Sequence, residues 1–484
     1  MMEAPTLAER LSLTDGNVLT DSVSGRKLVL DPAGVAFYDV FTRHGTGPGA
    51  LRELTTRFLV PPDRAAADYA AFVDLIDQGQ RCEGSILPGA HHAVLEPTSA
   101  CNGQCPHCYH NEHGTRWPDD QFARILDQVE RGGIKSVSIT GGEVFSAHFT
   151  DKFFALAEQL RERGVAVASV STNATFLTED VRDKILTALP TTTVFRISLD
   201  ALRGPLLDRI RPGYRHLSDP YAPIADLDTA GYPLVCTTNL FGEQTVDGVL
   251  EIGEHLRRYT NLRAWNLRMA VPVHFGTGER TDNPARRRQL FGTRPHPTLG
   301  LRFYAAVLRE HARAAYPYDV RMGNHLMTSA LRNPHVLTAK GDGHPCREDA
   351  ALVTLKASGQ VTQCPILTEL APELTMGSLH DDNDVLAPGY EDRLPLTGLH
   401  TTDMGCHTCP LLTLCGGGCR LYALGYDQGL TGCDLPARAL LTWMVTDPDR
   451  ILRDHWPAYH ARLLALLPDV ERVPTDASAA GGDR

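Results

Sequence analysis

The chain has 484 residues, of which 42% are hydrophobic and 22% are charged, and its formal net charge is −11 at pH 7. This composition is typical of a soluble globular protein with two or three domains, and the acidic balance argues against a nucleic acid partner, because phosphate binding requires a basic surface. No apolar run reaches the ~18 residues of a membrane span, and the N-terminus lacks the basic and apolar regions of a signal peptide. We therefore expect a cytoplasmic protein.

The first predicted domain covers residues 8–80. The expected elements are three short strands at 11–13, 17–20 and 26–30 and three helices at 32–43, 48–58 and 62–78. The pair Asp15-Gly16 favours a hairpin turn, and Asp31-Pro32 provides a helix cap followed by a first-turn proline. Three strands and three helices within so short a segment predict a small winged-helix-like α+β domain.

From His92 onward the pattern changes to strands that alternate with helices. The predicted strands lie at 92–96, 135–140, 165–171, 194–199, 234–239 and 262–271. Repeated βα units of this length predict an α/β fold with a parallel sheet over residues 90–320. In barrels built from such units, chemistry gathers at the C-terminal ends of the strands.

Three cysteines follow the first of these strands with the spacing C-x3-C-x2-C: Cys101, Cys105 and Cys108. Twelve cysteines in a cytoplasmic chain indicate metal ligands rather than disulfides. A structural zinc site or an ordinary cubane takes four protein ligands, so a loop with three thiolates leaves one position open for chemistry.

This spacing, together with Tyr109, resembles the signature loop of radical S-adenosylmethionine (SAM) enzymes. The resemblance implies a partial (β/α)6 TIM-like barrel in which the three cysteines hold a [4Fe-4S] cluster. The fourth iron of that cluster takes the amino and carboxylate groups of SAM.

Two more strand ends carry polar or glycine-rich segments. In Thr140-Gly141-Gly142-Glu143 the glycines allow a close backbone approach and the carboxylate suits an ammonium group, while Ser171-Thr172-Asn173 suits a ribose. In radical SAM enzymes the corresponding segments hold the methionyl amine and the ribose, although proline is usual at Val144 and glycine at Ala174.

The segments Arg196 to Asp200 and Asp208 to Arg211 resemble family segments near the cofactor's carboxylate and ribose, although a helix cap is an equally good interpretation for Asp200. The resemblance assigns cofactor contacts to Tyr109, Gly141, Gly142, Glu143, Ser171, Asn173 and Ser198.

A second group of cysteines lies within residues 340–440. Their order is Cys346, Cys364, Cys406, Cys409, Cys415, Cys419 and Cys433, with Gly359 between the first two. The order resembles the SPASM extension of radical SAM enzymes, which carries two auxiliary Fe–S clusters, although the last interval is shorter than usual. A zinc ribbon is the alternative for Cys406 and Cys409 taken alone.

The family's ligation pattern implies an outer cluster on Cys406, Cys409, Cys415 and Cys433, and an inner cluster on Cys346, Cys364 and Cys419. The inner cluster is then one protein ligand short, a place for Glu348, Asp349, a substrate cysteine or water. We expect Cys236 to be a core residue, assign nothing to Cys82, and expect helices and a tail over residues 441–484.

The first domain resembles the PqqD-like family through Ser24 to Gly34 and the closing Asp68 to Ile76. In that family the domain recognises a precursor peptide whose leader adds as an extra strand, so the resemblance implies leader binding at residues 8–80. A winged-helix DNA binder and a dimerisation domain are the alternatives.

These resemblances predict a radical SAM oxidoreductase that abstracts hydrogen from a ribosomally made precursor peptide and forms an intrapeptide thioether or carbon–carbon cross-link. An external donor such as flavodoxin or ferredoxin would supply electrons. The alternatives are a sulfatase-maturase-like enzyme, a haem-modifying SPASM enzyme and a leader-binding scaffold without activity. The first is disfavoured by Pro365, because those enzymes carry aspartate at this position.

Overall fold

The computed structural model describes residues 11–14, 18–21, 27–29, 32–57, 91–103, 107–110, 114–214, 221–270, 295–332, 352–380 and 399–467, with short stretches between these ranges. The chain divides into two compact units, residues 1–90 with 333–338 and residues 91–332 with 339–484. Cys82, Cys346, Glu348 and Asp349 lie outside the described residues.

The first unit is a small antiparallel sheet with helices. Strands β1 (Leu11–Thr14), β2 (Val18–Asp21) and β3 (Lys27–Val29) pair in the order β1-β2-β3. Helices α2 (Pro32–His44) and α3 (Pro48–Arg57) follow, and the described residues between 65 and 76 are also helical. The core contains Leu11, Leu19, Val40, Phe41 and Leu54, while the Tyr38 hydroxyl donates to the Leu11 carbonyl at 2.8 Å.

The second unit is built on an open sheet of eleven strands, most of them parallel. Its central strands follow one another in chain order: β4 (His91–Leu95), β5 (Ile134–Ile139), β6 (Ala166–Thr172), β7 (Val194–Ser198), β8 (Leu234–Leu240), β9 (Leu262–Met269) and β10 (Asp319–Met322). The α/β class and the parallel sheet are as predicted. The parallel strands, however, are two more than the six expected. One is β10, whose four residues are too few to produce a clear alternating pattern, and the other comes from residues 352–355, far along the chain.

Further strands extend both edges of this sheet. The short β11 (Leu326–Met327) pairs antiparallel with β10. On the opposite side β12 (Leu352–Leu355) lies parallel to β4, followed by the antiparallel β13 (Gln360–Thr362) and β14 (Thr375–Ser378). The cysteine-rich C-terminal part of the chain is therefore joined to the first strand of the parallel series by backbone hydrogen bonds.

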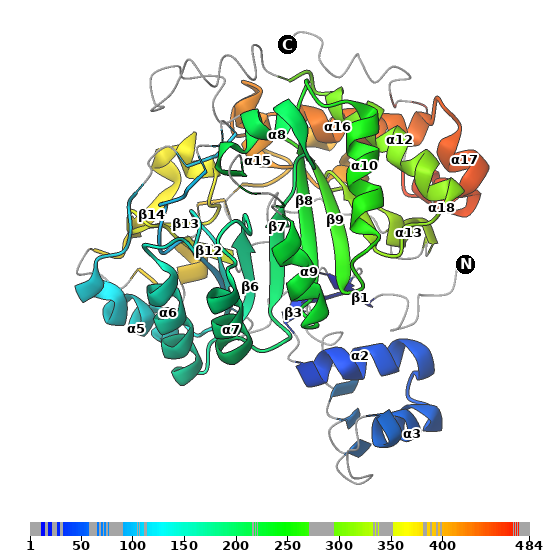
Figure 1. The fold of residues 1–484 in the computed structure, drawn as a ribbon. Coiled ribbons are helices and arrows are strands. Elements are labelled where there is room, and N and C mark those ends of the chain that lie inside the picture. The colour runs from blue at the N-terminus through cyan, green and yellow to red at the C-terminus, as the bar shows by residue number, and fades with distance from the viewer. Residues whose placement is uncertain are drawn as a thin grey trace. The chain divides into compact units, whose positions relative to one another are not determined.

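Helices cover the apolar face of the parallel strands (Figure 1). They are α5 (Phe122–Arg131), α6 (Thr150–Glu162), α7 (Glu179–Ala188), α8 (Gly204–Ile210), α9 (Ala222–Thr229), α10 (Val246–Leu256) and α12 (Leu299–Arg313). On α10, a Cβ at Gly253 would lie 2.8 Å from the fully buried Trp265 of β9, which shows how closely helix and sheet pack.

The other face of the strands is polar. His92 of β4 contacts the hydroxyls of Ser136 and Ser138 at 2.8 and 2.9 Å, and Ser169 of β6 donates to Ser138 at 2.7 Å. Arg196 of β7 continues this ladder to Ser169 at 3.2 Å. Because this face is polar across four neighbouring strands, it is suited to line a site for polar ligands and is not part of a packed apolar core.

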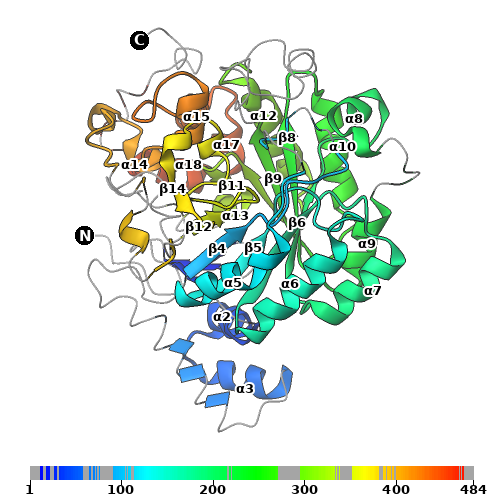
Figure 2. The ribbon, with the colours of Figure 1, turned by 90° about the vertical axis from the view of Figure 1, so that its left-hand side faces the viewer.

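The remaining helices are α13 (Thr328–Arg332), α14 (Leu412–Cys415), α15 (Arg420–Gly425), α16 (Leu435–Thr446), α17 (Ile451–His455) and α18 (Pro457–Ala465). Figure 2 shows α14, α15, α17 and α18 on the side of the unit where β12 and β14 lie. Asp434 caps α16, because its carboxylate accepts from the Ala437 amide at 3.0 Å. None of the helices in the described ranges has the length and apolar character to cross a membrane.

Candidate functional site

The loop with the first three cysteines begins at Cys101, six residues after the end of β4. The Cys108 amide donates to the Cys105 carbonyl at 3.0 Å, and the Gly103 amide lies 3.3 Å from the Cys101 sulfur. A Cβ on Gly103 would lie 3.1 Å from the Cys105 sulfur and 3.5 Å from the Cys101 sulfur. The two sulfurs thus gather around one small residue, where a side chain would occupy the space beside them.

Burial changes the chemistry of these thiols. It raises the pKa of the Cys101 thiol to about 12, and the nearby Glu143 carboxylate adds to this effect. A thiolate is the ligand form of cysteine, so this sulfur requires a strong local positive charge, such as a metal, to be ionised at neutral pH.

Gly141 and Gly142 follow β5 and lie directly against the segment that leads into the cysteine loop. The Gly142 amide donates to the Thr98 carbonyl at 2.7 Å, and the Glu143 amide donates to the Ala100 carbonyl at 2.8 Å. Cβ atoms at Gly141 and Gly142 would lie 2.3 and 2.0 Å from these two carbonyl oxygens. The close approach that the glycines permit is therefore one between two backbone segments, while their contact with the cofactor amine stays a prediction.

Glu143 links the end of β5 to the end of β6. Its buried carboxylate accepts from the Thr172 hydroxyl at 2.8 Å, the Asn173 amide at 2.7 Å and the Phe145 amide at 3.1 Å. Burial raises the pKa of Glu143, whereas these three donors favour its ionised form. The predicted partner of an ammonium group is thus already held in place by the chain itself.

Asn173 carries the connection onward to the cysteine loop. Its Nδ2 donates to Asn102 Oδ1 at 2.9 Å and lies 3.7 Å from the Cys101 sulfur. The next residue, Ala174, has a φ of 64°, which explains why glycine suits this position. The half-buried Ser171 and Ser198 lie on β6 and β7, on the polar face of the sheet.

A buried ion network that the sequence did not reveal supports the same loop. Asp200, which follows β7, accepts from Arg211 Nε at 2.8 Å and Nη2 at 2.6 Å, and from the Asn239 amide at 2.7 Å. His107 Nε2 lies 3.3 Å from the same carboxylate, and Arg211 Nη1 lies 3.9 Å from the Cys105 sulfur. Burial opposes ionisation, but Arg211 and His107 outweigh it and hold the pKa of Asp200 below its usual range.

The helix-cap interpretation of Asp200 is not seen, because α8 begins after Arg203, which makes no side-chain cap bond. Asp200 instead anchors a histidine that lies between two of the predicted cluster ligands. The resemblance placed the segments Arg196 to Asp200 and Asp208 to Arg211 near the cofactor, but it did not pair Asp200 with Arg211 or with His107.

Tyr109 also connects the loop to the rest of the unit. Its hydroxyl donates to Glu96 Oε1 at 2.5 Å, and its ring packs against an apolar cluster that includes Leu367 and Leu421. Cys364 and Cys419, two predicted inner-cluster ligands, pack against the same apolar cluster. The first cysteine loop and part of the second cysteine group are therefore neighbours in space.

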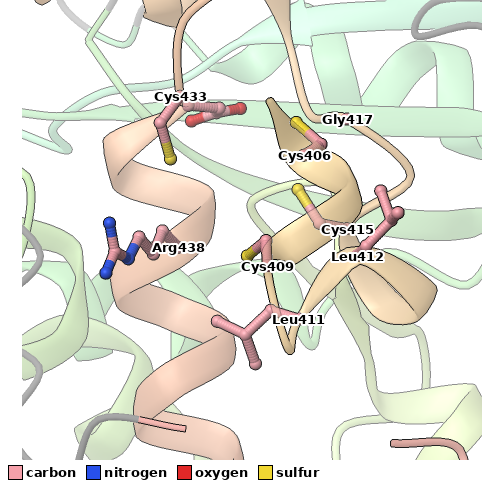
Figure 3. A pocket seen from close by; sticks show the side chains of 9 residues that line it. Cys406, Cys409, Leu411, Leu412, Cys415, Gly417, Cys433 and Arg438 are labelled. Atoms are coloured by element: carbon pink, nitrogen blue, oxygen red, sulfur yellow. The ribbon is translucent and has the colours of Figure 1, made fainter. Parts of the chain in front are cut away.

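The four predicted outer-cluster ligands line one cavity (Figure 3): Cys406, Cys409, Cys415 and Cys433. The space between these side chains, including its part that is open to solvent, is about 340 Å³. Figure 3 shows the four sulfurs around the space between α16 and the segment 406–415. Burial raises the pKa of the Cys433 thiol to about 11, while the charge of Arg438 opposes the rise.

Three consecutive glycines follow Cys415, the third of these ligands in the chain. Gly416, Gly417 and Gly418 all have positive φ, at 62°, 93° and 69°, so the chain turns sharply between Cys415 and Cys419. The Cys419 amide then donates to Asp434 at 2.8 Å. Cys346, Glu348 and Asp349, which the inner-cluster prediction also needs, lie outside the described residues.

The predicted sites involve clusters, in which each thiolate binds a different iron. Within the ranges that the structure describes, no three His, Cys, Asp or Glu side chains are placed to share one metal ion. Cys236 is completely buried on β8, as expected for a core residue.

Comparison with known proteins agrees with this arrangement. Residues 95–256 match the model of the Radical SAM superfamily, and this segment, with its cysteine loop and strand ends, is a radical SAM domain. No curated protein sequence matches the chain.

Two solved proteins share the fold. SuiB from Streptococcus suis bound to the precursor peptide SuiA is 15% identical, with a TM-score of 0.52 over 88% of this chain and 98% of that chain. A peptide-bound structure of anSMEcpe with AdoMet is 13% identical, with a TM-score of 0.52 over 78% of this chain and 99% of that chain. At such identities the likeness establishes the fold alone.

Proposed function

We propose that the protein is a radical SAM enzyme that joins two residues of a ribosomally made peptide by oxidation. The observation that carries this proposal is the convergence of the Cys101 and Cys105 sulfurs beside Asn173, which directly follows β6, and Arg211, which directly follows α8. Cys101, Cys105 and Cys108 would hold a [4Fe-4S] cluster. With SAM bound to it, such a cluster provides the radical chemistry that removes a hydrogen atom from an unactivated carbon.

The residues at the strand ends would bind and orient SAM. The segment Gly141 to Glu143 would face its amino group, and Ser171, Asn173 and Ser198 would face its ribose and carboxylate. Tyr109 would complete the contacts beside the loop. The protein residues thereby supply placement and exclusion of water, while the cofactor carries the hydrogen abstraction.

The second cysteine group would serve as an electron sink. Cys406, Cys409, Cys415 and Cys433 fit an outer cluster because they line one cavity, and Cys364 and Cys419, with Cys346, would hold the inner cluster. Forming a thioether from a carbon–hydrogen bond and a thiol removes one hydrogen atom, one proton and one electron. The cofactor would take the hydrogen atom, the inner cluster held by Cys364, Cys419 and Cys346 would accept the electron, and the proton would be released to a base or to water.

The peptide partner would bind through its leader at residues 8–80. Strand β3 is an edge strand of the described three-stranded sheet, where it pairs with β2, and the leader would add as a strand along its other side. SuiB, which shares the fold, was solved with its precursor peptide. A flavodoxin or ferredoxin would donate the electron that starts each turnover.

A sulfatase-type oxidation is the nearest competing activity, since anSMEcpe shares the fold. The residue after Cys364 is proline rather than an acid, and its carbonyl accepts from Lys356 Nζ at 3.3 Å. This position therefore offers no carboxylate as a proton acceptor, which favours the cross-linking reaction.

Anaerobic reconstitution with iron and sulfide tests the proposal. We expect iron for about three four-iron clusters, reductive cleavage of SAM to 5′-deoxyadenosine, and loss of two hydrogens from a leader-containing precursor by mass spectrometry. A leaderless peptide should be modified much more slowly. Two outcomes would contradict the proposal. One is a protein that binds only zinc, and the other is an enzyme that cleaves SAM but modifies no leader-containing peptide encoded beside its gene.

A further inference from the structure

Arg420 is a fully buried cation close to the cavity of the outer cysteines. It follows Cys419 at the start of α15, and its side chain is 0% exposed. Nη1 donates to the carbonyls of Leu430 and Gly432 at 2.9 and 2.8 Å, and Nη2 donates to the carbonyl of Gly417. Nε is buried and has no hydrogen-bond partner.

Among the described residues, the hydrogen-bond partners of the guanidinium are neutral carbonyl groups. Among the residues that the structure describes, no carboxylate forms an ion pair with Arg420. Burying a cation without an opposite charge costs several kcal/mol, and three carbonyl dipoles offset this cost only in part. A negative charge supplied by something other than a carboxylate would balance the site.

The candidate for that charge is the ligand set beside Arg420. Arg420 donates to the carbonyl of Gly417, and Gly417 itself lines the cavity of the four cysteines. A four-iron cluster with four thiolate ligands is an anion, because the thiolates outweigh the positive charge of the iron–sulfide core. Such a cluster in the cavity of Cys406, Cys409, Cys415 and Cys433 would supply the missing opposite charge.

Two of the carbonyl partners of Arg420 lie close in sequence to predicted cluster ligands. Gly417 lies two residues after Cys415, and Gly432 directly precedes Cys433. The guanidinium therefore links the segment 415–417 to the segment 430–433, which together carry two of the four ligands. Arg438 also lines the cavity, but it is only half-buried, and Figure 3 shows its guanidinium turned away from the sulfurs.

We propose that Arg420 is the counter-charge of the outer auxiliary cluster, where it positions the ligand segments and raises the reduction potential of the cluster. The proposal rests on the proposed function only in treating the four-cysteine cavity as a cluster site. Arg420 acts through the cluster and its ligands, and it takes no direct part in the reaction.

The test uses the full chain with Cys101, Cys105 and Cys108 replaced by alanine, so that only auxiliary clusters remain. In this background Arg420→Gln removes the charge and keeps some hydrogen bonding, and Arg420→Lys keeps the charge. Arg161→Gln is the matched control, because Arg161 pairs with Glu158 on the surface and does not line the cavity. Redox titration followed by electron paramagnetic resonance should give a more negative potential for Arg420→Gln, with Arg420→Lys nearer the parent and Arg161→Gln nearly unchanged. An unchanged potential in Arg420→Gln, or an equal shift in Arg420→Lys, overturns the proposal.

Thermal unfolding provides a second test of the proposal, which does not depend on measuring the reduction potential of the cluster. With iron bound, the lysine variant should melt at a higher temperature than the glutamine variant. After iron is removed, the difference should vanish or reverse, because the buried charge then has no partner. An equal advantage for lysine with and without iron overturns the proposal. If the parent with alanine at the three loop positions takes up no iron, the auxiliary-cluster assignment itself fails.

Discussion

The hydroxyl of Tyr109 donates a hydrogen bond of 2.5 Å to Oε1 of Glu96, which joins the end of the cysteine loop to the end of β4. The second carboxylate oxygen of Glu96 is buried without a hydrogen-bond partner. Burial raises the pKa of Glu96 to about 7, although the positive charge of Lys356 lowers it. The fold therefore favours the protonated form of this carboxyl below neutral pH.

A Glu96→Gln variant should change the pH dependence of stability. Because the pKa of Glu96 rises on folding from its ordinary 4.5 to about 7, this group makes the folded protein less stable as pH increases through that window. Above this pH window the loss in the free energy of unfolding is complete, and it amounts to about 3 kcal/mol. Glutamine does not titrate. Denaturant unfolding of the metal-free protein should therefore show that the free energy of unfolding decreases less in the variant than in the wild type between about pH 4.5 and 7.5.

Glu158→Gln is the matched control for this experiment, because Glu158 pairs with Arg161 on the surface, where both side chains are more than half exposed. Its pH dependence should follow that of the wild type. Parallel pH curves for Glu96→Gln and the wild type would contradict the prediction.

Asp200→Asn should destabilise the protein by about 3–5 kcal/mol, because it leaves the buried Arg211 without its opposite charge. It should also lower iron retention by the first loop, since His107 and Arg211 position that loop through Asp200. Denaturant unfolding and iron analysis measure the two effects. The pKa of Asp200 is depressed in the folded state, so its stabilisation should be present at neutral pH and decrease in acid.

Gly142→Ala should weaken both stability and cofactor binding. A Cβ there would lie 2.0 Å from the Ala100 carbonyl oxygen, so the backbone must move and disturb the hydrogen bond from Gly142 to Thr98. Overpacking of this kind costs about 1–3 kcal/mol or more. Gly242→Ala is the matched control, since a Cβ there meets no atom within 4 Å; equal effects from the two variants would refute the steric argument.

Replacing Cys101, Cys105 and Cys108 by alanine should abolish 5′-deoxyadenosine formation, because no ligands for the first cluster remain. Replacing Cys406 and Cys409 should preserve SAM cleavage in the reconstituted enzyme but reduce peptide modification. Chromatography of the reaction products measures both outcomes. Cys236→Ala, which changes a buried core cysteine, should keep the iron content of the wild type.

Deleting residues 1–80 should spare SAM cleavage and slow modification of a leader-containing peptide to the rate seen with a leaderless peptide. The division of the chain into two compact units near residue 90 supports a separable first unit. Mass spectrometry of the peptide measures the rate. Unchanged preference for the leader after the deletion would show that recognition lies elsewhere.

The sequence predicted those features that depend on local spacing. The cysteine loop, the ends of β5 and β6 and the gathering of Cys406 to Cys433 depend on short intervals and on the strand period. The ion pair between Asp200 and Arg211 was missed because it depends on the turn geometry after β7. The proximity of Glu96 to Lys356 was missed because these residues are far apart in the chain and meet only through β12.

The short strand β10 and the role of Arg420 were missed for different reasons. Four residues are too few to establish an alternating pattern, and an arginine after a cysteine gives no indication of burial. The charge environment of Arg420 follows from the turn through Gly416 to Gly418 and from the return of the chain at Gly432. Both depend on three-dimensional packing that spacing alone does not encode.

The pairing of β12 with β4 has a mechanical consequence. Four residues of each strand are in register, from Leu352 beside His92 to Leu355 beside Leu95, and the Glu96 amide continues the ladder to the Leu355 carbonyl at 2.8 Å. The hairpin that leads to Cys364 therefore cannot swing like a lid relative to the first cysteine loop without breaking a sheet. Under the proposed function, the distance between the site of hydrogen abstraction and the site of electron removal would then be a fixed length. A bound peptide would have to adapt to this length, so the reach of the substrate rather than closure of the enzyme would select the residues that are joined.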